Sequence, residues 1–527
     1  MEDGDPPQPP ASPPEDPRMR RQVQGRVLIL AICAAGIGGS FQYGYNLTII
    51  NAPTQPIQAF INQTWLERTG APLAGPGVTL AWSLAVSLFP LGGLAGALLA
   101  GPLALRLGRK KSLLLNNAFV LLSAVMVVSS RAAKAFEMIL LGRFLAGVNA
   151  GVGMSIQPMY LGESAPKDLR GSVALTSASF TALGLVAGQV VGLKEVLGAE
   201  EAWPLLLASN ALPALIQLLL LPWAPESPRF LLIDRGDPDS CLAALRSLRG
   251  GGDLAAEMKE LLAEGAAVQG KTPPAPWDLF CDRSIRRQLL SIVVLSSAMQ
   301  LCGNDSMYSY ASYIFRAAGI PEDKIQYWII GTGTCELLTA VTCTLVIERS
   351  GRRALVVSGY SLMAVWAVIF MVALSLQDRL PWAPYLSMAC IFAYILSFGI
   401  GPAGVTGIIP TEIFDQVSRP AAYVVSGSLL WTSLFLVGTA FPFIVEGLGH
   451  FCYLPFLAVC VCTALYVGLF LPETKGKTFL EISEEFRKCN FGGGPKCPLR
   501  IPGRLQRRKR KRRGRDPLPC SLPRFPS

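Results

Sequence analysis

This sequence has little charge and almost no histidine. Asp, Glu, Lys and Arg together make up 16% of its 527 residues, whereas hydrophobic residues make up 51%. A soluble chain of this length could not hide so much apolar surface, which excludes a string of water-soluble domains. The composition therefore predicts a protein that crosses a membrane many times.

Patterns typical of catalysis, cofactors and metals are also lacking. The single histidine, His450, falls in a predicted outer loop, and no nucleotide-binding or nucleophile motif stands out. The 13 cysteines show no paired Cys-x-x-Cys spacing. Several of them, such as Cys302, Cys335 and Cys343, lie within apolar runs, where small packing residues are the simplest interpretation. We therefore expect no enzyme activity, no cofactor and no metal ion.

The net charge of +11 could indicate a nucleic-acid partner, but its distribution argues against one. Basic residues gather in alternate short loops and in the C-terminal tail, which is the positive-inside pattern of membrane proteins. The almost wholly basic run at 504–515 is expected to be solvated or to lie near anionic lipid headgroups. We therefore expect a lipid bilayer, and no nucleic acid, around this chain.

Twelve apolar segments come close to the ~20 residues that a helix needs to cross a bilayer. An even number places both termini on one side, and the basic loops at 106–111 and 349–353 make that side cytosolic. The expected fold class is thus an all-α membrane protein. The predicted spans are 27–50, 78–103, 112–130, 136–160, 171–193, 203–224, 286–315, 325–347, 354–377, 382–411, 421–444 and 450–471.

These spans divide the chain into two six-helix halves, at 27–224 and 286–471. Residues 1–26, proline-rich and acidic at their start, are expected to be a disordered cytosolic segment with no cleavable signal peptide. The loop 225–285 has the apolar spacing of short cytosolic helices, and residues 472–527 are predicted to be a cytosolic tail. The first outer loop carries Asn62 in an N-glycosylation sequon, which agrees with this orientation.

Three short motifs occur twice, at offsets of 243, 249 and 247 residues. A near-constant offset of about half the chain indicates two similar halves in the same orientation, related by an axis along the membrane normal. The pairs are Gly-Arg-Lys at 108–110 with Gly-Arg-Arg at 351–353, Glu163 and Arg170 with Glu412 and Arg419, and Pro-Glu-Ser at 225–227 with Pro-Glu-Thr at 472–474.

The repeated motifs place opposite charges at helix ends on one face. Two halves that rock must close one side as they open the other, so ion pairs among these residues are predicted to hold the cytosolic side shut. The simpler alternative is a set of surface ion pairs worth under ~1 kcal/mol each, but repetition at symmetric positions favours a gate. The predicted cytosolic gate is Arg109, Glu163, Arg170, Glu226, Arg229, Glu348, Arg352, Glu412, Arg419 and Glu473.

The seventh span is unusual because polar residues lie in its middle. Gln300, Asn304 and Asp305 occur there, with Gly303 beside them. Polar groups deep in hydrocarbon are costly unless they face protein or water. Their presence predicts that a polar solute passes through the middle of the membrane.

The repeated motifs and their neighbours resemble the sugar porter family of the major facilitator superfamily, over residues 27–488. The run Ser-Phe-Gln-Tyr-Gly-Tyr-Asn at 40–46, and Gly407 in place of a tryptophan, are similar to the second class of animal facilitative hexose transporters, the fructose-handling branch. The motifs at 304–306 and 335–337 resemble one member of that class. The other residues that carry the resemblance are Arg143, Tyr160, 225–229, Gln300, Leu301, 348–353 and 472–476.

The resemblance implies the major facilitator fold, with twelve transmembrane helices in two pseudo-symmetric halves and a sugar held between them. Tyr308 and Tyr310 are further out and are predicted to form the extracellular gate. The predicted substrate contacts are Tyr43, Asn46, Gln300, Asn304, Asp305, Glu336 and Trp431.

The sequence departs from the family pattern at four positions, two of which are among the predicted substrate contacts. Ala178, flanked by two serines, and Met299 stand where the family has glutamines, and Asp305 and Glu336 stand where it has asparagines. Buried carboxyl groups can carry protons, so one hypothesis is that Asp305 or Glu336 makes transport depend on pH. The simpler alternative is that both carboxyl groups accept hydrogen bonds and never change charge.

Proton-coupled relatives have an aspartate in the first span, where this chain has Asn46, and asparagine cannot titrate. We therefore predict a facilitative uniporter for hexoses, fructose or glucose, that works by alternating access. The expected location is the plasma membrane, with internal vesicles as the alternative. A carrier of another small polar solute, a proton-linked sugar transporter, a sugar sensor that does not transport, and a homo-oligomer are left open.

Overall fold

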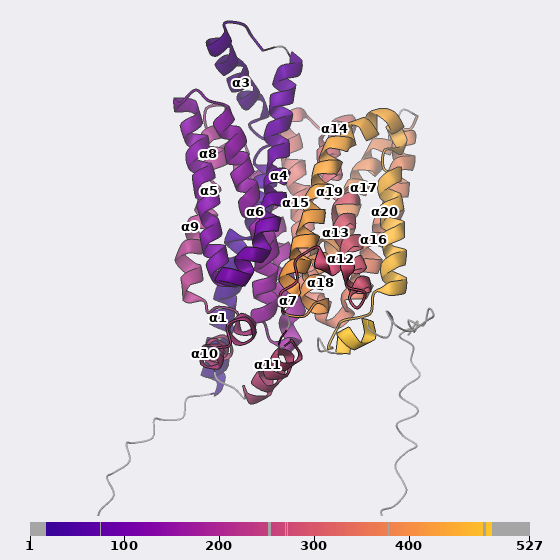
Figure 1. The fold of residues 1–527 in the computed structure, drawn as a ribbon. Helices are drawn as coiled ribbons and strands as arrows, with labels where there is room; N and C mark the ends of the chain where they lie inside the picture. Colours follow the sequence, from indigo (N-terminus) through magenta and orange to yellow (C-terminus); the bar gives the residue numbers. More distant parts are fainter. Residues whose placement is uncertain are drawn as a thin grey trace, which may run out of the picture.

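The computed structural model describes residues 17–73, 75–250, 254–268, 270, 272–377, 379–477 and 481–486. These residues form helices joined by short loops, arranged as two bundles that stand side by side (Figure 1). Residues 1–16 of the predicted N-terminal segment and the predicted basic run at 504–515 lie outside the described residues.

The first bundle runs from indigo to magenta in Figure 1, and the second from pink to yellow. The helices of the first are α1 (Pro17–Gly38), α2 (Ser40–Thr48), α3 (Thr54–Thr69), α4 (Gly75–Leu107), α5 (Arg109–Ala132), α6 (Glu137–Ser164), η1 (Lys167–Leu169), α7 (Arg170–Val191), α8 (Trp203–Ala208), α9 (Ala211–Leu220) and η2 (Leu221–Trp223). Those of the second are α13 (Arg286–Leu301), α14 (Asn304–Ala317), α15 (Glu322–Ser350), α16 (Arg352–Ser375), α17 (Ala383–Ile400), α18 (Pro402–Ile413), α19 (Arg419–Leu448), η4 (Gly449–Phe451) and α20 (Leu454–Phe470).

Ten helices among the described residues are long and apolar enough to cross a membrane, or eleven if the bent pair Phe443–Phe451 and Leu454–Phe470 counts as one span. Each of the twelve predicted spans nevertheless coincides with one helix or with consecutive helices. The two spans outside the ten are the seventh, which is divided into α13 and α14, and the twelfth, whose helix α20 has 17 residues. A divided helix and a short helix therefore account for the difference.

The break in the seventh span is built around Gly303. Its φ of +79° lies in the left-handed region that favours glycine, and the ring of Phe456 occupies the space where a side chain would be. The Tyr394 hydroxyl donates to the carbonyl oxygen of Cys302 at 2.5 Å, and the Tyr453 hydroxyl donates to that of Gly303 at 3.4 Å. The backbone groups freed by the break are thus satisfied inside the protein, as a membrane interior requires.

Large apolar side chains cover the outside of both bundles. Trp223, Leu345 and Leu219 expose 79%, 73% and 70% of their surfaces. Apolar surface on this scale needs an apolar surrounding, which lipid chains provide. The chain is therefore a multi-pass membrane protein.

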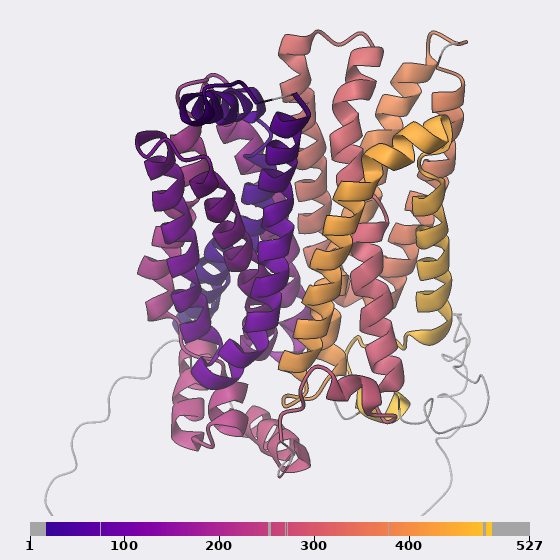
Figure 2. The same ribbon diagram turned by 45° about the horizontal axis from the view of Figure 1, so that its top comes forward.

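Short helices lie beneath the first bundle, at the end away from α3 (Figure 1, Figure 2). The side chain of Asp237 accepts a hydrogen bond from the backbone N–H of Ser240 at 3.0 Å and caps the start of the helix Pro238–Arg249. Hydrogen bonds from Ser240 also lower the pKa of Asp237. We call this end of the molecule the α10–α11 end. The helices beneath the first bundle are η3 (Phe230–Asp234), α10 (Pro238–Arg249) and α11 (Ala255–Val268), within the loop where short helices were predicted. A fourth short helix of that loop, α12 (Asp278–Cys281), contacts α13 of the second bundle (Figure 1).

Two segments differ from their expected local structure. Helix α1 begins at Pro17, so its first turns lie in the segment 1–26 that we expected to be disordered. The predicted outer loop that carries Asn62 is the helix α3, which ends at the left-handed Gly70. The Asn62 side chain accepts from the backbone N–H of Leu73 at 3.0 Å. Glycosylation of Asn62, like the limits of the domains, stays a prediction.

Candidate functional site

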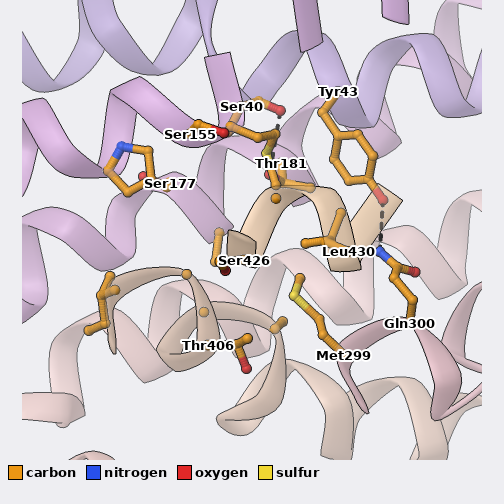
Figure 3. A pocket seen from close by; sticks show the side chains of 18 of the residues that line it. Ser40, Tyr43, Ser155, Ser177, Thr181, Met299, Gln300, Thr406, Ser426 and Leu430 are labelled. Carbon is orange, nitrogen blue, oxygen red and sulfur yellow. Dashed lines mark hydrogen bonds between the residues drawn. The ribbon is translucent and has the colours of Figure 1, made fainter. Parts of the chain in front are cut away.

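A cavity of about 960 Å³, including the space at its opening, lies between the two bundles. Side chains of α2, α6 and α7 face side chains of α13, α18 and α19 across it (Figure 3). Among the described residues, no three His, Cys, Asp or Glu side chains are grouped as metal ligands. The polar lining residues are Ser40, Tyr43, Ser155, Ser177, Thr181, Gln300, Asp305, Glu336, Thr406, Tyr423, Ser426 and Trp431.

Five of the seven predicted substrate contacts line this cavity: Tyr43, Gln300, Asp305, Glu336 and Trp431. Nε2 of Gln300 donates to the hydroxyl of Tyr43 at 3.2 Å, which is a hydrogen bond between the two halves (Figure 3). The ring of Tyr43 meets that of Trp431 edge-on, with centroids 5.4 Å apart. A side chain from each half and a flat aromatic ring therefore meet at one point of the cavity.

The structure does not bring Asn46 to the cavity, contrary to the prediction. Its Nδ2 donates to the carbonyl oxygen of Gln42 at 2.9 Å, and its Oδ1 accepts from Nδ2 of Asn210 at 3.1 Å. Residues four apart share a helix face, so Tyr43 and Leu47 line the cavity while Gln42 and Asn46 form the neighbouring face. Asn46 thus stabilises the interior of the first bundle.

The two carboxyl groups of the cavity have polar neighbours on the second half. Asn304 does not line the cavity, but its side chain is buried and hydrogen-bonds the carboxyl groups of Asp305 and Glu336. The hydroxyl of Tyr308 donates to Oε2 of Glu336 at 2.5 Å. Tyr308, predicted for the extracellular gate, is therefore tied to a cavity residue, whereas the side chain of Tyr310 lies outside the described residues.

Sequence reasoning missed the hydroxyl groups that line the cavity. Within the described part of the chain, Oγ of Ser40, Oγ of Ser177 and Nε1 of Trp431 are buried and make no hydrogen bond. Each such group costs about 1–3 kcal/mol when it stays unpaired. Three of them around one cavity indicate a ligand that both donates and accepts. Ser177, next to Ala178 in an apolar span, could have indicated such a hydroxyl group. The sequence alone could not show that Ser177 lies on the helix face that lines the cavity.

The charged motifs of the first half meet at the α10–α11 end. Nε of the fully buried Arg109 pairs with Oε2 of Glu163 at 3.0 Å, and its NH1 pairs with Asp234 at 3.0 Å. Oγ of Ser227 also donates to Glu163, at 2.5 Å, and the backbone N–H of Arg109 donates to Glu226 at 3.0 Å. Burial raises the pKa of Asp234, while the Arg109 guanidinium acts in the opposite direction.

The second half repeats these contacts at the repeated positions. Nε of Arg352 donates to Oε1 of Glu412 at 2.9 Å, and Oγ1 of Thr474 donates to Oε2 of Glu412 at 2.5 Å. The backbone N–H of Arg352 donates to Glu473 at 2.9 Å. Arg352 also pairs with Glu348, one turn earlier, at 3.0 Å. The internal repeat seen in the sequence is therefore a repeat of contacts.

Three contacts join the halves at this end. NH1 of Arg419 pairs with Oε1 of Glu163 at 3.2 Å, and both side chains are fully buried. The backbone N–H of Ser172 donates to Glu348 at 3.1 Å, and Nε2 of Gln416 donates to Asp234 at 3.3 Å. A fully buried ion pair is not one of the weak surface pairs that we considered as the alternative. The α10–α11 end is thus closed.

Two arginines of the predicted cytosolic gate, Arg229 and Arg170, take no part in the ion pairs described above. Arg229 pairs with Glu264 of α11 at 3.3 Å. Arg170 makes no ion pair and no side-chain hydrogen bond within the ranges that the structure describes. The contacts made by Asp234 and Gln416 could not be predicted, because both depend on how helices distant in the sequence pack. The hydroxyl groups of the repeated Pro-Glu-Ser and Pro-Glu-Thr motifs could have been recognised from their repetition.

The comparisons with known proteins agree with one another. Residues 30–486 match the family described as "Sugar (and other) transporter". The Homo sapiens protein "Solute carrier family 2, facilitated glucose transporter member 11" is 67% identical over 473 residues, covering 90% of this chain and 95% of that protein. Member 5 from Equus caballus is 42% identical over 476 residues, covering 90% and 95%, and member 9 from Mus musculus is 42% identical over 468 residues, covering 89% and 87%.

These relatives bear out the resemblance drawn from the motifs, including the single member indicated by residues 304–306 and 335–337, which is member 11. These relatives are transporters, which confirms the prediction that the chain is not an enzyme. The proton:xylose symporter XylE bound to 6-bromo-6-deoxy-D-glucose has a TM-score of 0.76 at 22% identity, covering 88% of this chain and 100% of that chain. Inward-open XylE from E. coli has a TM-score of 0.64 at 20% identity, covering 88% and 99%. The all-α major facilitator fold is thus confirmed.

Proposed function

Because the chain belongs to the sugar transporter family of the major facilitator superfamily, we propose that it moves a hexose, fructose or glucose, by facilitated diffusion. The observation that carries this proposal is the cavity between the halves with its unpaired polar atoms. The relatives named member 5 and member 11 are facilitated glucose transporters by name, which supports a sugar as the solute.

The chemistry of the cavity suits a hexose. Sugar hydroxyl groups both donate and accept, and so do the amide of Gln300 and the hydroxyl groups of Ser40 and Ser177. The indole N–H of Trp431 needs an acceptor, and its ring can pack against the flat face of a sugar ring. An organic anion would instead meet Asp305 and Glu336, so the lining supports a neutral solute.

The contacts between the halves support transport by alternating access. In the described state, the buried pair of Arg419 and Glu163 holds the α10–α11 end together. Opening of this end requires that pair to separate while the halves rock about the cavity. We place this end in the cytosol, with both termini, because the basic loops lie there.

We propose uniport rather than proton coupling. Asn46, at the position where proton-coupled relatives have an aspartate, cannot titrate and is hydrogen-bonded inside the first bundle. The second candidate, a proton-linked transporter, is favoured by one observation, because Asp305 and Glu336 both line the cavity. Uphill accumulation of sugar under a proton gradient would distinguish the two.

The proposal is tested by counterflow with the purified full chain in proteoliposomes. Vesicles are loaded with unlabelled fructose or glucose, without a proton gradient, and uptake of the labelled sugar is followed. We expect uptake above that of empty vesicles, and the ratio of the two rates ranks the sugars. No uptake of either sugar would exclude the hexose proposal and leave another solute or a sensor.

A matched pair of variants tests the cavity. Thr181→Trp places an indole in the cavity, whereas Thr342→Trp places one on the exposed outer surface of α15. We expect loss of uptake only in the first variant. Equal uptake by the two would show that sugar does not pass through this cavity.

The remaining proposals concern the surroundings of the chain. We propose the plasma membrane as its location and N-glycosylation of Asn62 in the outer helix α3. The basic run at 504–515 is proposed to lie near anionic lipids.

A further inference from the structure

A second cavity, of about 400 Å³ including its opening, lies between the halves at the α10–α11 end. The charges of its lining are unbalanced, because five of the side chains are cationic and one is a carboxylate. These side chains are Lys167, Arg170, Arg229, Arg352, Lys477 and Glu412.

Three of the five cations have carboxylate partners. Arg352 pairs with Glu412 at 2.9 Å, and Arg229 pairs with Glu264 at 3.3 Å. Lys477 is paired in the same way with a glutamate of the C-terminal segment. These carboxylates are therefore engaged and do not neutralise the other two cations.

The two remaining cations, Arg170 and Lys167, have no ion pair within the described ranges, and Nε of Arg170 is buried without a hydrogen-bond partner. The internal repeat shows what is missing. Arg419, the counterpart of Arg170, reaches across to Glu163 at 3.2 Å. Glu412, the counterpart of that acceptor, is taken by residues of its own half.

The electrostatic surroundings of Arg170 include charges of both signs. Arg229 and Arg419 repel its guanidinium, while Glu260 and Glu264 attract it. None of these carboxylates comes within ion-pair distance of Arg170 in the described structure. A partly buried cation whose Nε is buried without a close counter-charge is costly, and an anion in the adjacent cavity would remove that cost.

We propose that this second cavity binds a phosphate-bearing anion, held by Arg170 and Lys167 from the first half and by Lys477 from the second, which would exchange its partly exposed pair with Glu485 for the anion. Guanidinium and ammonium groups are the side chains that bind phosphate oxygens best. Basic pockets between helices on the cytosolic side of membrane proteins bind phosphorylated headgroups by the same chemistry. The phosphate can therefore belong to a soluble ester or to an anionic phospholipid.

Such an anion would act on the conformation of the molecule. Because its ligands come from both halves, it binds the state in which the α10–α11 end is closed and loses ligands when that end opens. A ligand with this preference shifts the population towards the closed state. The consequence for sugar transport, slower opening of this end, rests on the proposed function, whereas binding itself does not.

The test measures binding to the purified full chain without any sugar. Inorganic pyrophosphate is titrated in detergent, with sodium chloride at matched ionic strength, and the melting temperature and the dissociation constant are recorded. A second experiment compares nanodiscs that contain a phosphoinositide with nanodiscs made of phosphatidylcholine alone. Stabilisation by pyrophosphate indicates a soluble phosphate ester, and stabilisation by phosphoinositide alone indicates a lipid headgroup; both outcomes support the site.

Variants locate the site. Lys167→Gln and Arg170→Gln should each raise the dissociation constant by about tenfold or more, as the loss of a charge-assisted hydrogen bond predicts. Lys167 is exposed, so its variant is expected to fold even if the Arg170 variant does not. Arg246→Gln, on the exposed face of α10, removes one cation from the same end and should leave binding unchanged.

Two results would overturn the proposal. One is that neither pyrophosphate nor phosphoinositide stabilises the protein more than the matched salt or lipid. The other is that Lys167→Gln binds as tightly as Arg246→Gln, which would mean that the anion associates with basic surface in general.

Discussion

At the scale of single residues, Gln300 links the cavity lining of the second half to the first half. It donates to the Tyr43 hydroxyl at 3.2 Å and lines the cavity. Gln300→Leu removes every polar atom of this side chain, whereas Tyr43→Phe removes only the hydroxyl and keeps the ring against Trp431. We expect the first variant to slow counterflow about tenfold, the effect of roughly 1.4 kcal/mol, and the second to slow it less.

Initial rates of counterflow, normalised to the amount of reconstituted protein, measure this difference. If both variants lose the same activity, the hydrogen bond between the halves is what transport needs. The slower counterflow of the Gln300→Leu variant would then be explained without any contact between Gln300 and the sugar.

The carboxyl groups of Asp305 and Glu336 give a second prediction at this scale. Under uniport they accept hydrogen bonds without changing charge, as Glu336 does from Tyr308. Asp305→Asn and Glu336→Gln should therefore leave the dependence of counterflow on pH as it is in the unmodified protein. A pH dependence that disappears in one of the variants would instead identify that residue as a protonation switch.

At the scale of elements, the break between α13 and α14 depends on Gly303. A methyl group there would meet the ring of Phe456, and the residue also has a positive φ. Gly319 has a similar φ of +82° with open space around it. Gly303→Ala should lower the melting temperature more than Gly319→Ala, because both add about 1–3 kcal/mol of backbone strain but only the first adds a collision.

Thermal unfolding of the two variants in the same detergent compares these costs. An equal decrease in both would mean that Phe456 moves aside without cost. The break would then depend on backbone conformation alone.

At the scale of the whole molecule, an ion pair between Arg419 and Glu163 joins the two halves at the α10–α11 end. Glu163→Gln weakens the contacts with both Arg109 and Arg419, whereas Glu412→Gln weakens an equivalent contact with Arg352 inside one half. We expect Glu163→Gln to raise amide hydrogen exchange on both sides of the interface, at the end of α6 and the start of α19. The rise after Glu412→Gln should stay within the second half.

Hydrogen exchange followed by mass spectrometry resolves these segments. The expected increase is at least about tenfold, because a buried charge that loses its partner costs roughly 3–5 kcal/mol. Equal patterns in the two variants would show that the pair of Glu163 and Arg419 does not hold the halves together.

The class of this protein, its spans and its repeat could all be predicted from the amino-acid sequence. A span is a property of about twenty consecutive residues, so composition alone locates it. The motifs around Arg109 and Arg352 recur along the chain, and their contacts recur in space because each motif lies at the same helix end in its own half. The resemblance to a family then placed five of the lining residues of the cavity by position.

Which polar groups face the cavity, and which charged groups pair, depends on how the helices pack against one another. Asn46 lies on the helix face beside the one that carries Tyr43, and rotation about a helix axis is set by its packing partners. Arg170 and Arg419 occupy matching positions in the sequence, yet among the residues that the structure describes Arg419 pairs with a carboxylate and Arg170 does not. The two halves meet at a single interface, and small differences in how their helices pack there decide which of two equivalent arginines is paired.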